Sequence, residues 1–180
     1  MQPESGQPNE QERSVLDRFF SGLSEYVFES QLGVADVQLV DYVSGLMQRF
    51  VRVDATTRLR RRDGTPVTEV FQMLCEAEQR IGIAKREIHR SIGDFTLFWS
   101  GMYPERLRNQ SAGDHDGFES YCRHGKRSYA IAAQIEGGED RPPSEVLHRL
   151  SEQFELCAYG LREIRRSWEQ SDSESGLLFD

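Results

Sequence analysis

Long apolar runs and secretion signals are missing from this sequence. No stretch of the 180-residue chain approaches the roughly 20 consecutive apolar residues that span a bilayer. The first residues have neither the basic start nor the apolar segment of a signal peptide. We therefore expect a cytoplasmic protein that makes no contact with a membrane.

Excess positive charge is missing as well. The chain carries 22 Lys and Arg against 30 Asp and Glu, a net charge of −8, whereas binding along a nucleic-acid backbone needs a surplus of cations. Seven of the acidic residues lie within residues 1–12 and 169–180, so the body between them is close to neutral. The basic cluster at residues 58–62 is interpreted as a solvated charge run, with phosphate or acidic-peptide binding as the alternative. The composition argues against nucleic acid as the partner.

Cysteine is scarce, and its spacing is not that of a metal site. Cys75, Cys122 and Cys157 are far apart, and each falls within an apolar helical stripe. An odd number of isolated cysteines in a cytosolic chain predicts buried, reduced thiols. Metal ligation requires further ligands at short spacing, and none are present. We expect no metal and no other cofactor.

No complete catalytic motif is present, whether a nucleophile elbow, a phosphate-binding loop, a dinucleotide fingerprint or a zinc-protease motif. His115-Asp116 resembles the metal-binding pair of the all-helical HD-type phosphohydrolases, but it lies in a glycine-bearing loop rather than on a helix. Glu145 and His148 have the Glu-x-x-His spacing of ferritin-like di-iron proteins, yet such a site needs two copies of the motif and one occurs. Whether the protein is an enzyme stays open, and these absences favour a protein that is not.

Helical periodicity is what the sequence does contain. Apolar residues recur at intervals of three and four, and strict alternation is hard to find. We expect an all-α domain of five or six helices, either a helical bundle or an orthogonal helical array. The domain should span residues 14–168, between a disordered acidic tail at 1–13 and a flexible acidic tail at 169–180.

Glycine and proline mark the expected helix ends. Gly33 and Gly82 predict breaks between helices. Pro66 fits the first turn of a helix, and Pro104 should end or kink another. The first helix should start near residue 14 and bury one face, made of Leu16, Phe19, Phe20, Leu23, Tyr26 and Val27.

The last expected helix carries a heptad pattern. Its apolar positions alternate spacings of three and four, at Leu147, Leu150, Phe154, Cys157, Leu161, Ile164 and Trp168. We interpret the pattern as one long helix that crosses an antiparallel bundle. The alternative is the seam of a coiled-coil dimer, because bundles and coiled coils share this packing.

An acidic residue inside an aromatic helix is the most unusual local feature. Asp94 directly follows Gly93 within Gly-Asp-Phe-Thr-Leu-Phe-Trp, where a buried carboxylate needs polar partners. The structural interpretation is a hydrogen bond to the fifth helix, with Gly93 and Gly125 allowing close approach. The candidate donors there are Tyr121, Arg123, Lys126 and Tyr129. The functional alternative is an aromatic ligand pocket, formed by Asp94, Phe98, Trp99, Tyr121 and Tyr129.

The same segments carry a family resemblance. Gly93-Asp94-Phe95, with the Leu-Phe, Gly and Pro-Glu that follow, and then Tyr121, Gly125 and Ser128-Tyr129, resemble a pattern in uncharacterised bacterial helical proteins. The resemblance covers about residues 90–130. It implies an all-helical fold and a bacterial source, and no activity comes with it.

The chain ends in an apolar motif. Leu177, Leu178 and Phe179 follow an acidic stretch, and short apolar motifs of this kind commonly bind grooves on partner proteins. Docking on its own domain or simple disorder is the preferred interpretation of this segment, and a partner-binding motif is the alternative. The leading hypothesis is thus a non-enzymatic helical module that acts by protein–protein contact or self-association. A small-molecule-binding protein or enzyme built around Asp94 is the runner-up.

Overall fold

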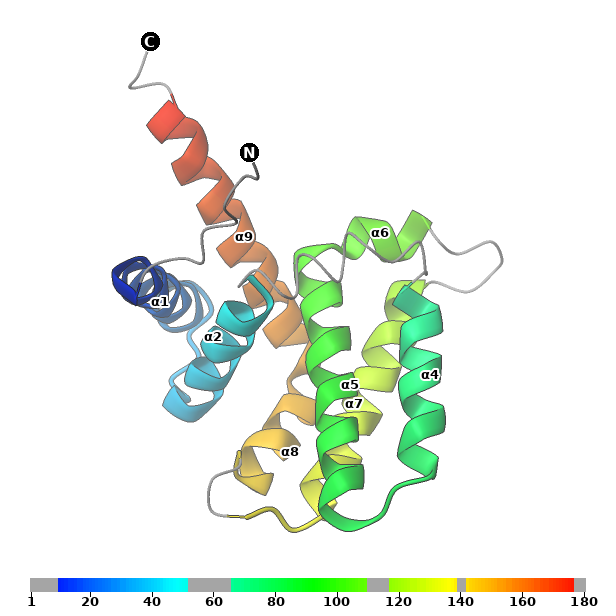
Figure 1. Cartoon of the computed structure of the whole chain (residues 1–180). Helices are drawn as coiled ribbons and strands as arrows, with labels where there is room; N and C mark the ends of the chain where they lie inside the picture. Colours follow the sequence, from blue (N-terminus) through cyan, green and yellow to red (C-terminus); the bar gives the residue numbers. More distant parts are fainter. Residues whose placement is uncertain (1–9, 52–65, 110–116, 139–141, 177–180) are drawn as a thin grey trace, which may run out of the picture.

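The computed structural model describes residues 10–51, 66–109, 117–138 and 142–176, and these are almost entirely helical (Figure 1). No strand occurs in these ranges, so the predicted all-α fold is confirmed. None of the helices in them combines the length and the apolarity needed to cross a bilayer. The elements in chain order are α1 (Glu10–Glu25), the π-helical turn η1 (Tyr26–Gln31), α2 (Val37–Val51), α4 (Pro66–Glu78), α5 (Gly82–Met102), α6 (Pro104–Asn109), α7 (Gly117–Gln134), α8 (Ser144–Glu152) and α9 (Phe154–Gly176).

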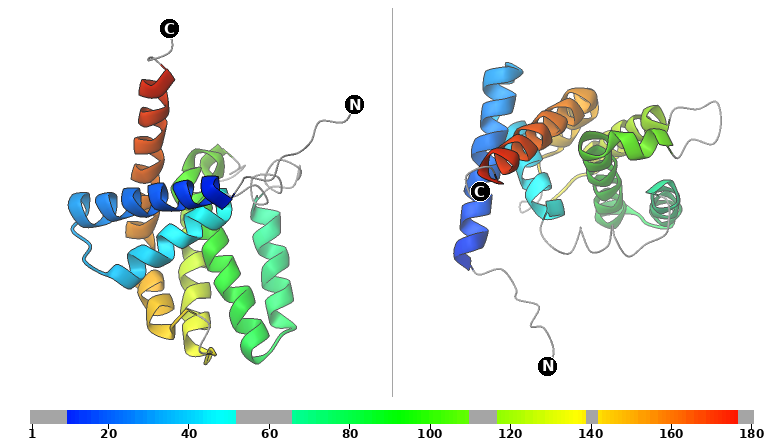
Figure 2. Two further views of the ribbon diagram at one scale, coloured as in Figure 1. Left: turned by 60° about the vertical axis from the view of Figure 1, so that its left-hand side comes forward. Right: turned by 90° about the horizontal axis from the view of Figure 1, so that it is seen from above.

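The fold is arranged around α5. Helices α4 and α7 both pack on α5 and run antiparallel to it, and α9 packs on it as well (Figure 1). Helices α1 and α2 form a separate pair that contacts α8, α9 and the middle of α5. Figure 2 shows α1 at the edge of the molecule, on the side away from α4 and α7. One long face of α1 therefore points away from the other helices.

Bare glycines set the close packing of the central helices. A Cβ at Gly93 would lie 2.6 Å from the ring of Tyr129, and one at Gly125 would lie 2.3 Å from the ring of Phe154. These distances are far inside van der Waals contact, so only glycine allows α5, α7 and α9 to approach in this way. The predicted role of Gly93 and Gly125 in close approach is confirmed.

The predicted helix boundaries at glycine and proline are also confirmed. Gly33 and Gly82 have positive φ angles of 68° and 56°, a backbone conformation that glycine adopts without strain. Helix α4 begins at Pro66, and Pro104 begins α6 directly after α5 has ended. Proline fits a first helical turn because its missing N–H would have no partner there.

The heptad pattern at residues 147–168 belongs to the core of the chain itself. All of its apolar side chains are fully buried except that of Trp168, which is half-buried against Phe20. The pattern is divided between α8 and α9 by a turn at Gln153, which no proline or glycine marks. The expectation of one unbroken helix is wrong, and the alternative of a coiled-coil dimer seam fails because these side chains are covered by helices of the same chain.

Helices extend further toward both ends than expected. Helix α1 begins at Glu10, and α9 continues to Gly176, eight residues past the predicted limit of the domain. Polar residues with good helix propensity can extend a helix that packing has already started. The expected flexible tail at 169–180 is therefore helical over most of its length.

The face predicted for the first helix is partly wrong. Phe20 and Val27 are buried and Leu23 is half-buried, whereas Phe19 and Tyr26 are exposed. The apolar residues of this segment cover too wide an arc to face one neighbour. They form two adjacent stripes, of which one packs on the domain and the other points outward.

Candidate functional site

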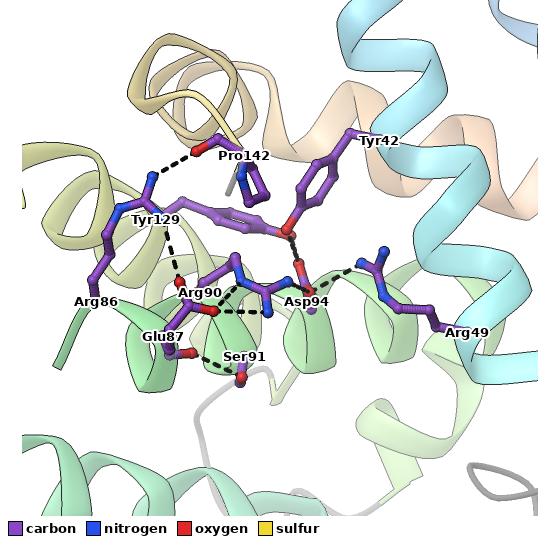
Figure 3. Close-up of polar contacts among 9 residues, drawn as sticks. All are labelled: Tyr42, Arg49, Arg86, Glu87, Arg90, Ser91, Asp94, Tyr129 and Pro142. Carbon is purple, nitrogen blue, oxygen red and sulfur yellow. Dashed lines mark hydrogen bonds and ion pairs between the residues drawn. The ribbon is translucent and has the colours of Figure 1, made fainter. Parts of the chain in front are cut away.

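Asp94 lies at the meeting point of three helices. It is buried near the middle of α5, and Tyr42 from α2 and Tyr129 from α7 point their hydroxyl groups at it (Figure 3). The two hydroxyls donate hydrogen bonds to Oδ1 over 2.6 Å and 2.8 Å respectively. Arg49 from α2 and Arg90 from α5 each place a guanidinium nitrogen 3.2 Å from Oδ2.

These four contacts use the full capacity of the carboxylate. A carboxylate has about four acceptor positions, two on each oxygen, and each oxygen of Asp94 accepts from two donors. Asp94 thus has no acceptor position left with which to orient a ligand. The geometry is that of a structural clamp between α2, α5 and α7.

The electrostatics of the cluster stabilise protonated tyrosines and charged arginine. Burial, followed by the negative charge of Asp94, raises the pKa of Tyr42 and that of Tyr129 well above 10. Burial alone would lower the pKa of the Arg90 guanidinium, but Asp94, Tyr42 and Glu87 together outweigh it and raise that pKa. Neither tyrosine is therefore available as a general base near neutral pH.

A chain of ion pairs continues from the carboxylate along α5. Arg90 also bonds Glu87 at 3.0 Å, and Glu87 in turn pairs with Arg86 at 3.3 Å (Figure 3). Arg86 is almost fully buried and donates to the backbone carbonyls of Ile135 and Pro142 over 2.9 Å and 2.6 Å. The series ties the end of α7 and the approach to α8 to the centre of α5.

The structure brings together two of the five residues predicted for a pocket. Asp94 and Tyr129 are hydrogen-bonded, as the structural interpretation expected, and the other named donors on that helix are not in the cluster. Phe98 stacks on Phe50 at 4.5 Å between ring centroids. Trp99 packs with Phe95 and Tyr103, and the guanidinium of Arg106 lies over its ring. Tyr121 is buried in the core.

Three members of the cluster were missed at the level of the sequence. Arg90 precedes Asp94 by four residues, and an acid and a base at this spacing on one helix commonly pair, so this contact could have been found. Tyr42 and Arg49 lie 52 and 45 residues away on α2. Helical periodicity does not say which distant helix faces which, and no local signal marks them.

The other candidate chemistries are placed as follows. Among the described residues, no group of three or more His, Cys, Asp or Glu side chains is positioned to hold a metal. Glu145 and His148 are both exposed, and His148 pairs with Glu152. Cys122 and Cys157 are buried thiols outside any disulfide, as predicted, and burial raises the pKa of Cys157 to about 12. Cys75 is exposed, which corrects that prediction, because α4 packs on α5 by another face.

Three predicted features fall outside the described residues. They are the apolar motif Leu177, Leu178 and Phe179, the basic cluster at residues 58–62 and the His-Asp pair at residues 115–116.

An exposed apolar stripe on α1 is the surface feature that sequence analysis did not isolate. Val15, Phe19 and Tyr26 have exposed fractions of 66%, 41% and 56%. Val15, Phe19 and Gly22 lie on α1, and Tyr26 is the first residue of η1, which directly continues it. Their spacings of four, three and four place the four residues along one line. Apart from its chain neighbours and the nearby backbone of its own helix, no heavy atom of the described residues lies within 4 Å of the position that a Cβ at Gly22 would take. We call these four residues the α1 stripe.

Comparison of the chain with protein-family models, with curated proteins and with solved structures gives no match. The resemblance to bacterial helical proteins stays a prediction.

Proposed function

We propose that the protein is a non-enzymatic helical module that acts by protein–protein contact, and that the α1 stripe is its contact surface. The observation that carries the proposal is the alignment of three large exposed apolar side chains, two on α1 and the third at the start of η1. Isolated exposed apolar residues are normal on protein surfaces, whereas a contiguous row of them is typical of an interaction site.

The other exposed apolar side chains do not form such a row. Val37, Phe71 and Tyr159 lie on three different helices, Ile81 lies just before α5, and Ile83 lies in the first turn of α5. The spacing of the α1 stripe is that of a helix seam, in which each side chain packs into the facing helix. A partner helix is therefore the simplest complement to this surface.

The saturated carboxylate at Asp94 favours this function over ligand binding or catalysis. A ligand-orienting acid keeps an acceptor for the ligand, while the oxygens of Asp94 are occupied by four donors of the chain itself. A ligand pocket at Asp94 would require one of these four hydrogen bonds to break. The pattern around Asp94, which resembles that of bacterial helical proteins, supports a bacterial source.

Site-specific crosslinking tests the proposal. A photoreactive phenylalanine analogue is placed at Val15 in the full-length chain, and a control chain carries it at Tyr159, which is also exposed but lies on α9. In lysate of the cells of origin we expect a discrete protein adduct from position 15 and none from position 159. Adding Phe19→Glu to the chain that carries the crosslinker should abolish the adduct. Equal labelling from both positions, or none from position 15, would contradict the proposal.

A further inference from the structure

The α1 stripe is complementary to itself when it is reversed. In an antiparallel pair of α1 helices with a two-fold axis between residues 20 and 21, Phe19 of each copy lies opposite Gly22 of the other. Val15 of each copy lies opposite Tyr26 of the other. Each contact thus joins a large side chain to a smaller one, and the bare Gly22 leaves room for the phenylalanine ring.

The charges beside the stripe obey the same symmetry. Arg18 and Glu25 are both exposed and seven residues apart, so they lie on the same side of the stripe. In the antiparallel pair, Arg18 of one copy comes within two residues of Glu25 of the other, an axial offset of about 3 Å. The two-fold axis makes this ion pair twice. Within the described part of the chain, neither side chain takes part in an ion pair of its own.

We infer that the α1 stripe is the interface of an antiparallel homodimer, with a second copy of this chain as its occupant. The inference rests on the proposed function and names its partner. A parallel pair in register would place Phe19 against Phe19 and Gly22 against Gly22, which combines a crowded layer with an empty one. A different protein as partner would not require the stripe to match its own reverse.

The size of the stripe predicts a weak and reversible dimer. Its four residues extend over about 16 Å of helix. Two helices in contact over that length bury less than the roughly 1,200 Å² of a standard stable interface, which is the size range of weak and transient contacts. The peripheral position of α1 leaves this face accessible among the described elements (Figure 2).

Sedimentation velocity of the full-length chain over a range of concentrations tests the dimer. We expect the wild-type chain to shift from monomer to dimer as its concentration rises. Phe19→Glu places a carboxylate in the seam and should leave the chain monomeric with an unchanged circular dichroism spectrum. Phe71→Glu is the matched control, because Phe71 is exposed on α4, outside the stripe, and this variant should dimerise like the wild type.

Charge exchange tests the antiparallel arrangement itself. Arg18→Glu and Glu25→Arg should each weaken the dimer about tenfold, because two attractive contacts become repulsive. The double variant R18E/E25R should restore the wild-type dissociation constant. If the double variant is weaker than both single ones, the antiparallel register is wrong and the proposal falls.

Three other outcomes would overturn the homodimer. The first is a wild-type chain that stays monomeric at every concentration. If a crosslinker at Val15 nevertheless captures another protein, the proposed function stands and only the second copy is excluded. The second is a dimer that Phe19→Glu does not affect. The third is a chain that dimerises only when residues 177–180 are deleted, since this would assign the stripe to the C-terminal motif.

Discussion

Replacing Asp94 by asparagine removes the charge at the centre of the helix clamp while it keeps the shape of the side chain. An amide has one acceptor oxygen and a nitrogen that only donates. Four donors converge on the two oxygens of Asp94. In the Asp94→Asn variant, two of these four donors must therefore face the amide nitrogen, which cannot accept a hydrogen bond, or turn away.

The expected loss follows from how each contact is buried. A hydrogen bond from a buried tyrosine to a charged group contributes about 1.5–3 kcal/mol, and the hydroxyls of Tyr42 and Tyr129 can recover part of it by accepting from the new amide. The Arg49 side chain is 49% exposed, so solvent screens its ion pair and this contact adds little. Arg90 is more deeply buried and loses its acceptor charge. We expect a decrease of about 3 kcal/mol in the free energy of unfolding, at the lower end of the range for breaking a buried ion pair.

Urea denaturation followed by circular dichroism measures this decrease. Asp41→Asn is the matched control, because Asp41 is an exposed acid on α2, and its effect should stay within about 0.5 kcal/mol. The reasoning would be refuted if Asp94→Asn unfolded within about 0.5 kcal/mol of the wild type at an unchanged m-value. A stable Asp94→Asn chain that had lost a ligand would instead support the pocket.

Three further predictions follow from the packing and the buried titratable groups. Gly125→Ala places a methyl group 2.3 Å from the buried ring of Phe154 and should lower the free energy of unfolding by about 2 kcal/mol. Gly45→Ala has room for its methyl group and should raise the free energy of unfolding by about 0.5 kcal/mol. Urea denaturation compares the two variants. Above pH 10, Tyr42 and Tyr129 lose their protons in the unfolded chain but retain them in the folded chain, so the free energy of unfolding should fall with rising pH. In a chain with both tyrosines changed to phenylalanine, the melting temperature should fall less steeply as the pH rises above 10. Burial, followed by the charge of Lys85, lowers the pKa of His89 below 6.5, and both its ring nitrogens are buried without a hydrogen-bond partner in the described structure. The unfolded chain therefore binds a proton more readily than the folded chain, and the free energy of unfolding should fall as the pH drops through 6.5. His89→Leu should reduce this dependence on pH in acid titrations followed by tryptophan fluorescence.

The fold class and most helix boundaries could be predicted because they depend on local patterns. The three-to-four spacing of apolar residues marked the helices, and Gly33, Gly82, Pro66 and Pro104 lie where the chain changes direction. The turn at Gln153 could not be predicted, since neither a helix breaker nor a gap in the apolar pattern marks it.

To predict the partners of Asp94 and the exposure of the α1 stripe, one would have to know which helices pack against each other. The contact of Asp94 with Tyr129 was among the predicted alternatives, because the aromatic and glycine pattern of α5 and α7 suggested that these helices touch. Tyr42 and Arg49 reach Asp94 from α2, and the sequence says nothing about that contact. Phe19 was assigned to the buried face, because the sequence shows two adjacent apolar stripes and the packing of α2 decides which one is covered.

Amide hydrogen exchange of the full-length chain, measured far below and far above the dissociation constant of the dimer, tests the central claim most directly. We expect the peptides covering residues 15–26 to exchange more slowly at the high concentration, and those from α4 to exchange at the same rate in both samples. Identical exchange of residues 15–26 at the two concentrations, or protection confined to another helix, would contradict the assignment of the α1 stripe as the contact surface of a dimer.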